Sequence, residues 1–253
     1  MKLSIIVPVL NEAELLTGFL RHLRDRAPEA DIIVVEGGST DGSLYIVRGL
    51  QTELVLSVIQ TGSGRARQMN AGAAMASGDV LWFVHVDSRV APTAVHAIEQ
   101  ASAEPEVAGG CFRLRIPRRR WIYRVSDWLG NAGVDAFHVA LGDHGIFCRR
   151  DIFQAVEGFP DVPLMEDAEL YRAVGRLGRV RQLREFIDTS PRFYEKHGAC
   201  RTTVFYAIIL ALYFLGVRPE VLARLYARIG RKRPAFARRG RRTGCFPGAP
   251  SPD

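Results

Sequence analysis

His85 and Asp87 are polar residues that follow directly on an unbroken apolar run at residues 80–84. Residues two apart in an extended chain point to the same side, so these side chains would face one site. The run is too short for an ordinary helix and is typical of a buried parallel strand. Because open α/β sheets bind ligands beyond the carboxyl ends of their strands, the pattern favours a metal or phosphate site. A solvated turn with a helix-capping Asp87 is the simpler alternative.

A second candidate pair, Glu166 and Asp167, stands at the start of a helix expected at residues 166–177. Acids in the first turn of a helix interact favourably with its dipole, and this effect alone could explain them. The functional interpretation makes Asp167 a general base above the sheet, with Glu166 fixing its position. A carboxylate in that role takes a proton from an attacking hydroxyl group.

A glycine-rich segment at residues 62–70 leads into a helix expected at residues 65–76. Glycines before a helix N-terminus, together with two arginines, could cradle a diphosphate. The segment lacks the Gly-Lys-Ser/Thr ending of a P-loop and the spacing of a dinucleotide fingerprint. A solvated basic helix face is the alternative to a site made by Gly62, Arg65, Arg67 and Asn70.

Acidic residues also follow the first two expected strands. Glu12 and Glu36 could accept hydrogen bonds from a nucleobase or a ribose, and Pro8 and Asn11 belong to the same strand end. We expect Asn11 to cap the next helix, with Glu14 three residues on as in a capping box. The alternative is that Glu12 is only a first-turn acid and Glu36 only caps a turn.

A scaffold of alternating strands and helices would bring these residues together. Apolar runs predict strands at residues 3–9, 31–36, 54–60 and 80–84, with helices between them. Short connections between such elements predict an α/β fold with a doubly wound, mostly parallel sheet flanked by helices. In the second half we expect an antiparallel strand at 112–116, strands at 145–149 and 180–188, and C-terminal helices at 202–215 and 220–229.

The composition is that of a globular protein, with 253 residues of which 47% are hydrophobic and 24% charged. Its four cysteines are scattered, without a CxxC pair or a cysteine–histidine cluster. This pattern argues against a disulfide framework or a zinc site and indicates a reducing compartment. Because a strand begins at Leu3, we expect no signal peptide before it and a cytoplasmic location.

The net charge of +7 is concentrated near the C-terminus. Seven basic residues fall within residues 231–242, whereas residues 1–230 carry 27 basic and 26 acidic residues. The near-neutral body argues against nucleic acid as a partner. The basic tail, residues 231–253, is rich in Pro and Gly and is typical of a flexible arm.

Residues 204–217 form an apolar segment of 14 residues, shorter than the roughly 20 that span a bilayer. Taken alone, this segment is best interpreted as a buried core helix. An amphipathic helix at 220–229, followed by the basic tail, favours peripheral docking on anionic lipid. The corresponding location is the inner face of the cell membrane.

Taken in order, the motifs resemble those of the inverting family 2 glycosyltransferases with the GT-A type fold. The resemblance covers residues 3–195 and rests on segments 4–12, 36–43, 67–72, 78–87 and 166–167. It implies a transferase domain at 1–200, C-terminal helices at 201–230 packed on the domain or on a membrane surface, and a tail at 231–253. A bacterial subgroup, the radical-SAM/selenodomain-associated transferases, is similar through segments 64–70, 142–147, 165–167 and 189–192.

The resemblance implies that a sugar moves from a nucleoside-diphosphate sugar, with a UDP-sugar expected first, to an acceptor hydroxyl with inversion. By position, Glu36 would read the nucleoside and Asp79 would lie near the base or ribose. Asp87 would bind Mg²⁺ or Mn²⁺ on the diphosphate, and Asp167 would be the catalytic base. The acceptor stays open, with a lipid-linked hydroxyl as one candidate.

Two departures from the family pattern bear on these expectations. His85 stands where the metal motif normally has its first Asp, so its part in metal binding stays open. The Q-x-x-R-W motif of processive, membrane-embedded polymerases is absent from the sequence, which argues against a polysaccharide synthase. Charge on the departing diphosphate would also be neutralised by Arg67 and Arg192.

Two other functions remain open on the sequence. A sugar nucleotidyltransferase would need a glycine- and arginine-rich loop directly after the first strand, where Pro8 to Asn11 stand instead. A non-catalytic module that binds sugar nucleotides or a membrane surface is suggested by the atypical His85. The pair Glu166 and Asp167 argues against such a module.

Overall fold

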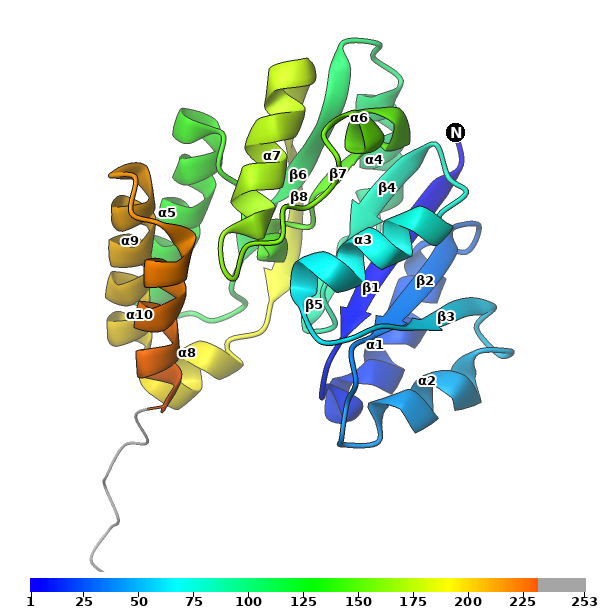
Figure 1. Ribbon diagram of the computed structural model, residues 1–253, viewed down its shortest axis with the longest axis horizontal. Coiled ribbons are helices and arrows are strands. Elements are labelled where there is room, and N and C mark those ends of the chain that lie inside the picture. The colour runs from blue at the N-terminus through cyan, green and yellow to red at the C-terminus, as the bar shows by residue number, and fades with distance from the viewer. Residues whose placement is uncertain (232–253) are drawn as a thin grey trace, which may run out of the picture.

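The computed structural model describes residues 1–231, and its first half is a parallel sheet as the sequence predicts (Figure 1). Strand β1 (Leu3–Val9) pairs in parallel with β2 (Asp31–Glu36) and with β4 (Val80–Phe83), and β2 pairs with β3 (Leu56–Gln60). Helices α1 (Ala13–Arg26), α2 (Ser43–Leu50) and α3 (Arg65–Met75) connect them. The carboxyl ends of these strands therefore meet at one edge, which is where the candidate residues follow.

The second half completes an eight-stranded sheet in the order β3-β2-β1-β4-β7-β6-β8-β5. Strand β7 (Phe147–Arg149) lies antiparallel between β4 and β6 (Val107–Arg115). Strand β8 (Arg179–Thr189) runs parallel to β6, and the short β5 (Ser88–Val90) is antiparallel to β8. The strand predicted at 112–116 is thus longer than expected, and it is antiparallel only toward β7. Three-residue β5 was not predicted, because such a short strand has no detectable periodicity.

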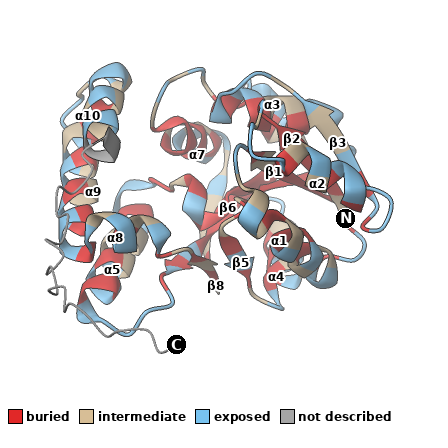
Figure 2. Cartoon of the chain, turned by 90° about the horizontal axis from the view of Figure 1, so that it is seen from below, coloured by how far each residue is buried: buried red, intermediate tan, exposed pale blue. Residues whose placement is uncertain are grey.

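Side chains that alternate along the strands build two cores, one on each face of the sheet. Figure 2 shows buried residues along the sheet and on the helices that cover it. Ile5 and Val7 pack with α1, α2 and α4 (Ala94–Ser102), whereas Ile6 packs with α3 and α7 (Glu166–Leu177). In β4, Trp82 belongs to the core that contains Ile5, and Phe83 belongs to the core that contains Ile6. Burial on both faces explains why β1, β2 and β4 are continuous apolar runs in the sequence.

The C-terminal helices join the sheet domain through a third core. Helix α9 (Ala199–Phe214) packs Phe205 and Ile209 with Met165 and Ala168 at the start of α7. Helices α5 (Trp121–Phe137) and α10 (Pro219–Arg231) lie beside α9 at the same end of the molecule (Figures 1 and 2). The interpretation of residues 204–217 as a buried core helix holds for one side of α9 only, because residues on its other side, including Ile208, are exposed.

Within residues 1–231, none of the helices combines the length and the apolar character that crossing a membrane requires. The predicted flexible arm at residues 231–253 lies, apart from Arg231, outside the described residues.

Candidate active site

Asp167 lies buried in the first turn of α7 and faces the loop that precedes β7. Its Oδ2 accepts a hydrogen bond from the backbone N–H of Gly142, with an N···O distance of 2.9 Å. Met165 before the helix adopts a left-handed backbone conformation, which turns the chain sharply into α7. Burial, and then the charge of Glu166, raise the pKa of Asp167 to about 7. A carboxylate with such a pKa can exchange a proton near neutral pH.

Arg65, in the first turn of α3, approaches both acids of α7. Its Nη1 lies 3.5 Å from Oε1 of Glu166 and 3.7 Å from Oδ2 of Asp167. The guanidinium remains half exposed, while both carboxylates are buried. A cavity of about 320 Å³ lies between the glycine-rich loop before α3 and the segment before α7, and it is lined by Arg65, Arg67 and Glu166. The structure therefore joins the predicted diphosphate cradle to the predicted base.

The side chains of His85 and Asp167 both point toward Gly142. A Cβ atom added to Gly142 would lie 2.6 Å from Nε2 of His85 and 2.7 Å from Oδ2 of Asp167. Nε2 of His85 is buried and has no hydrogen-bond partner in the described residues. Burial, and then the nearby Arg65, lower the pKa of His85 to about 3, so its imidazole is neutral at pH 7. A neutral ring with a free nitrogen can bind a metal ion or a polar group of a ligand.

Asp87 lies near enough to Asp143, a residue that the sequence reasoning did not select, for the charge of one carboxylate to act on the other. Burial, and then the charge of Asp143, raise the pKa of Asp87 to about 6, while Arg192 and Arg65 act in the opposite direction. The pKa of Asp143 is also raised, mainly because the chain around its carboxyl group removes water, although the residue as a whole is exposed. Two neighbouring carboxylates with raised pKa values form a place where a cation would be stabilised.

The carboxylates and His85 fit a divalent cation only in part. Among the described residues, no three His, Cys, Asp or Glu side chains come close enough together to enclose an ion. Mg²⁺ and Mn²⁺ favour oxygen ligands, and Mg²⁺ is commonly held by one or two carboxylates together with substrate phosphates. The donors Asp87 and Asp143 fit an ion that is shared with a diphosphate.

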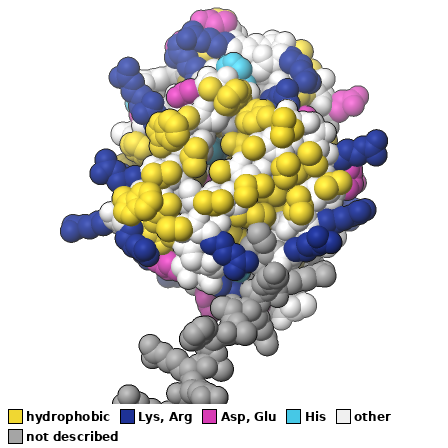
Figure 3. All heavy atoms as spheres, turned by 90° about the vertical axis from the view of Figure 1, so that its left-hand side faces the viewer, with side chains coloured by type: hydrophobic (Ala, Val, Ile, Leu, Met, Phe, Trp, Pro, Cys, Tyr) yellow, Lys and Arg dark blue, Asp and Glu magenta, His cyan; other side chains and the backbone are white. Residues whose placement is uncertain are grey.

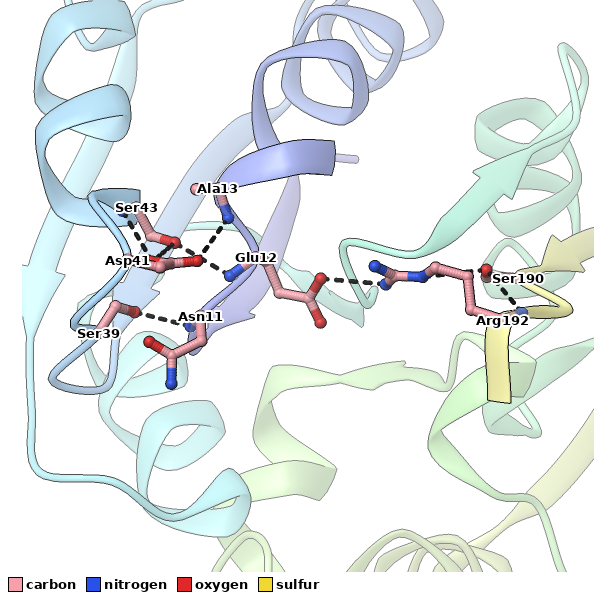
Figure 4. Close-up of polar contacts among 8 residues, drawn as sticks. All are labelled: Asn11, Glu12, Ala13, Ser39, Asp41, Ser43, Ser190 and Arg192. Atoms are coloured by element: carbon pink, nitrogen blue, oxygen red, sulfur yellow. Dashed lines mark hydrogen bonds and ion pairs between the residues drawn. The ribbon is translucent and has the colours of Figure 1, made fainter. Parts of the chain in front are cut away.

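Arg192 reaches across the site to the end of β1 (Figure 4). Its Nη2 donates a hydrogen bond to Oε2 of Glu12 at 3.1 Å, and its Nε donates to Oγ of Ser190 at 3.2 Å. Arg192 begins the short helix α8 (Arg192–His197), which follows β8. The pairing of Ser88 with Thr189 in β5 and β8 brings this arginine beside Asp87. Two of the predicted ligands, Glu12 and Arg192, are therefore partners of each other.

The loop after β2 holds the N-terminus of α1 (Figure 4). The N–H groups of Asn11 and Ala13 donate to Oγ of Ser39 and Oδ2 of Asp41, both at 2.9 Å. The prediction that Asn11 caps α1 is wrong, because Asn11 has a positive φ of 55° and its Oδ1 accepts a hydrogen bond from the N–H of Thr40. The cap comes from a distant segment, which no local pattern reveals.

Glu36, at the end of β2, forms hydrogen bonds with this loop and is 1% exposed. Its carboxylate accepts hydrogen bonds from the N–H groups of Gly38 and Ser39 and from Nε2 of Gln60. Burial alone would raise the pKa of Glu36, but these hydrogen bonds outweigh it and lower the pKa. The simpler interpretation, a turn cap, accounts for all of these contacts.

Two of the predicted nucleotide ligands lie elsewhere. Asp79 precedes β4 and accepts a hydrogen bond from the N–H of Lys2, before β1, so it lies at the amino edge of the sheet. The expectation that Asp79 lies near the nucleoside is therefore wrong. Asn70 uses its amide oxygen and nitrogen to hold the backbone N–H and C=O of Phe159, and it is a structural clamp rather than a free ligand.

Arg67 and Gly62 lie together in the glycine-rich loop. A Cβ atom at Gly62 would stand 2.9 Å from Nη1 of Arg67, so the glycine leaves room for this exposed guanidinium. Pro8 is half-buried near the end of β1, opposite Val35 of β2, and it shapes the strand end rather than presenting a polar group.

Three aromatic side chains beside the cleft were also missed by the sequence reasoning. Phe193 of α8 lies 5.9 Å from Tyr206 of α9 and 6.1 Å from Tyr226 of α10, between ring centroids. Burial and Tyr226, and then the charge of Asp143, raise the pKa of Tyr206, which places the cluster near that carboxylate. The side chains come from three helices, so only folding brings them together.

A parallel-stranded α/β sheet with arginines and acids at its carboxyl edge defines the class of enzymes that bind nucleotides there. The sequence model of glycosyl transferase family 2 matches residues 4–151, and the chain belongs to this family. The predicted membership of glycosyl transferase family 2 is thereby confirmed.

Two curated relatives illustrate the range of the family. An uncharacterized glycosyltransferase of Nostoc sp. is 25% identical over 218 residues, which is 79% of this chain and 66% of the relative. A prophage bactoprenol glucosyl transferase homolog of Escherichia coli K12 is 27% identical over 176 residues, 64% of this chain and 56% of the relative. The chain thus spans about two thirds of the length of the first relative and just over half of the second.

Solved structures share the fold. The mannosyltransferase PcManGT from Pyrobaculum calidifontis, in complex with GDP-Man and Mn²⁺, superposes with a TM-score of 0.64 at 19% identity, over 90% of this chain and 69% of that one. Staphylococcus aureus TarS 1-349 with UDP-GlcNAc gives a TM-score of 0.55 at 20% identity, over 75% and 58% of the two chains. The predicted GT-A type sheet is confirmed by this likeness.

Proposed function

We propose that this glycosyltransferase moves a sugar from a nucleoside-diphosphate sugar to an acceptor hydroxyl, with inversion and with Asp167 as the base. The observation that carries the proposal is a buried carboxylate whose pKa is raised to about 7, placed beside an arginine of the glycine-rich loop. Arg65 and Glu166 line the cavity before α3, and Arg65 also reaches Asp167, which supports one site for the base and the diphosphate.

In the proposed reaction, Asp167 takes the proton of the acceptor hydroxyl while that oxygen attacks the anomeric carbon. The bond from this carbon to the diphosphate oxygen breaks on the opposite face, and a single displacement of this kind inverts the carbon. Arg65 and Arg67 offer N–H donors and positive charge to the departing diphosphate. General base assistance contributes about 10²–10⁴ in rate.

A divalent cation, Mg²⁺ or Mn²⁺, would supply further charge neutralisation on the diphosphate when bound. Asp87 and Asp143 are the residues that would hold it, and the Nε2 of His85, which is unpartnered within the described residues and lies near Gly142 together with Asp167, is a further candidate ligand. The complex of PcManGT with Mn²⁺ and GDP-Man supports the presence of a divalent cation. A UDP-sugar is the first donor to test, because TarS is solved with UDP-GlcNAc.

The acceptor proposed here is a lipid-linked hydroxyl, supported by the similarity to bactoprenol glucosyl transferases. A cytoplasmic enzyme that docks peripherally on the membrane would meet such an acceptor. Residues 1–200 are proposed as the transferase domain, with residues 201–230 packed on it through the third core. Membership of the radical-SAM/selenodomain-associated subgroup remains a proposal based on the segments around Gly142 and Asp167.

Donor hydrolysis measured with a panel of sugar nucleotides in the presence of Mn²⁺ tests this function. We expect slow release of nucleoside diphosphate from one donor, and a faster release when the acceptor is added. Release of pyrophosphate from a nucleoside triphosphate and a sugar phosphate would instead show a nucleotidyltransferase. Binding without any turnover of any donor would contradict the proposal.

A further inference from the structure

Helices α5, α9 and α10 present an apolar surface to solvent (Figure 3). Of the sixteen large hydrophobic side chains exposed in the described residues, nine lie on these helices or directly after α9. They include Trp121 at 68% exposure, Trp128 at 67% and Leu215 at 79%. Contiguous apolar surface of this kind marks a site of interaction. We call it the docking face, and define it by Trp121, Val125, Trp128, Val204, Ile208 and Leu215.

The side chains of the docking face form one surface because α5 and α9 run parallel. The rings of Phe137 and Phe214 lie 4.6 Å apart near the C-terminal ends, and Ile122 packs with Ala199 near the N-terminal ends. On α5 each exposed residue precedes a residue of the side that contacts α9, as Trp121 precedes Ile122. On α9 each exposed residue follows a residue of the side that contacts α5, as Leu215 follows Phe214. One residue is about 100° of helix rotation, so in parallel helices these opposite offsets turn both stripes the same way.

Arginines border the docking face (Figure 3). Within residues 1–231, Arg118 pairs with Glu195, whereas other exposed arginines on or beside these helices form no ion pair; they include Arg119, Arg120, Arg124, Arg201 and Arg218. The exposed acids on the described parts of the three helices are Asp135 and Glu220. The face is therefore apolar in its middle and positively charged at its rim.

We propose that the docking face inserts into the interfacial layer of an anionic bilayer, with Trp121 and Trp128 as anchors. Tryptophan is enriched at membrane–water interfaces, and arginines near the surface are attracted to anionic headgroups. A second copy of the chain is a poorer occupant, because a two-fold interface would bring the same arginine rim against itself. The inference rests on the proposed membrane-associated function and assigns it to α5 and α9 rather than to α10 and the tail alone.

This placement would also bring the catalytic cleft close to the lipid surface. Helix α9 holds the start of α7 through the contacts of Phe205 and Ile209 with Met165 and Ala168. Tyr206 of α9 and Tyr226 of α10 lie near Phe193 of α8, and the charge of Asp143 acts on Tyr206. A lipid-linked acceptor would thus reach the base from the membrane side.

Intrinsic fluorescence of the full chain can test the inference directly. The sequence has three tryptophans, and Trp82 is fully buried, so changes in emission report on Trp121 and Trp128. We expect a blue shift on titration with vesicles of mixed phosphatidylglycerol and phosphatidylcholine, and quenching when the lipid chains are brominated near the headgroup. Pure phosphatidylcholine vesicles should bind more weakly, and added salt should weaken binding to the anionic ones.

A face variant carries Trp121→Ser, Trp128→Ser, Ile208→Ser and Leu215→Ser. Its vesicle affinity, measured by sedimentation, should fall by about tenfold or more, since four apolar side chains leave the interface. The matched control is Tyr45→Ser with Met75→Ser, which removes exposed apolar side chains of α2 and α3 and should bind as the wild type does. Thermal melting and donor hydrolysis show whether the face variant stays folded and active.

Three outcomes would overturn the inference. The first is a wild type that does not sediment with anionic vesicles. The second is a folded face variant that binds them as tightly as the wild type, which would assign binding to the tail. A concentration-dependent dimer that is lost in the face variant, without vesicle binding, would assign the face to a second copy. Failure of donor hydrolysis in every form would count against the proposed function and leave the vesicle result unaffected.

Discussion

Nη1 of Arg65 lies 3.7 Å from Oδ2 of Asp167, and this pair joins the two halves of the site. Arg65 begins α3 in the parallel half of the sheet, and Asp167 lies in α7 of the second half. The arginine lowers a pKa that burial and Glu166 raise, so the carboxylate stays ready to release or take a proton near pH 7. The same guanidinium lines the cavity expected to hold a diphosphate.

The first prediction concerns the role of Asp167 in turnover. Asp167→Asn should keep donor affinity and lower kcat by about 10²–10⁴, because the amide has nearly the same shape but cannot take a proton. Donor titration and steady-state transfer on this variant measure the two effects separately. If Asp167 were only a helix acid, its neutralisation would cost about 0.3–1 kcal/mol of stability and turnover would be nearly unchanged.

The same substitution should stabilise the fold at alkaline pH. The folded-state pKa of Asp167 is raised to about 7 from an unfolded value near 4, so its protonated form is favoured by folding. Stability from this group is fully present below about pH 4 and is lost as the pH rises through about 7. Asp167→Asn should therefore melt higher than the wild type at pH 8, by roughly 1–3 kcal/mol of unfolding free energy. Equal melting of both proteins from pH 4 to 8 would show that the carboxyl titrates normally.

Removing the charge of Arg65 should move the pH profile of the reaction. Arg65 holds the pKa of Asp167 down, so in Arg65→Gln that pKa rises and the acid limb of kcat/KM shifts to higher pH. Arg67→Gln is the matched control, since this neighbouring arginine forms no ion pair with Glu166 or Asp167 among the described residues. It should weaken donor binding and leave the acid limb in place. Identical shifts in both variants would argue against a specific effect of Arg65.

The metal prediction concerns Asp87 and Asp143. Nucleoside diphosphate should bind more tightly with Mn²⁺ or Mg²⁺, and Asp87→Ala or Asp143→Asn should remove that dependence, because carboxylates and phosphate oxygens share these ions. Isothermal titration calorimetry with and without the ion measures it. His85→Asp should preserve or strengthen the metal dependence if His85 shares the ion. Binding of the wild type that is independent of metal would reject the assignment.

Gly142 is predicted to be essential for the geometry of the site. A methyl group there would stand under 3 Å from both His85 and Asp167, so Gly142→Ala should displace them and reduce turnover by at least about tenfold. Gly130→Ala is a matched control on α5, where the added methyl group would meet Leu114 at 3.5 Å in ordinary contact. This control should be active and slightly more stable, by up to about 1 kcal/mol. Full activity of Gly142→Ala would show that the loop adapts.

Much of the sheet and the family could be predicted from the sequence because the signals are local. The buried strands β1, β2 and β4 are apolar runs bounded by polar residues, and each motif lies at a strand end or a helix start. Parallel strands that alternate with helices must end at one edge, so His85, Glu12 and Arg65 could be expected to gather there. Their proposed roles remain predictions.

Other features depend on contacts between segments far apart in the chain. Asp143 meets Asp87, and Asp41 caps α1, only because loops from different strands fold against each other. Asp79 belongs to the same motif as His85 and Asp87, yet it lies at the opposite edge of the sheet because it precedes β4 instead of following it.

The apolar segment at residues 204–217 shows the same division between sequence and structure. Its composition by itself determined that α9 would seek an apolar environment along its length. Only the tertiary structure decided which side is covered: Phe205 and Ile209 pack on α7, while Val204 and Ile208 face outward. The physical reason is that a helix apolar all round has no moment to orient it, so its neighbours choose its buried face.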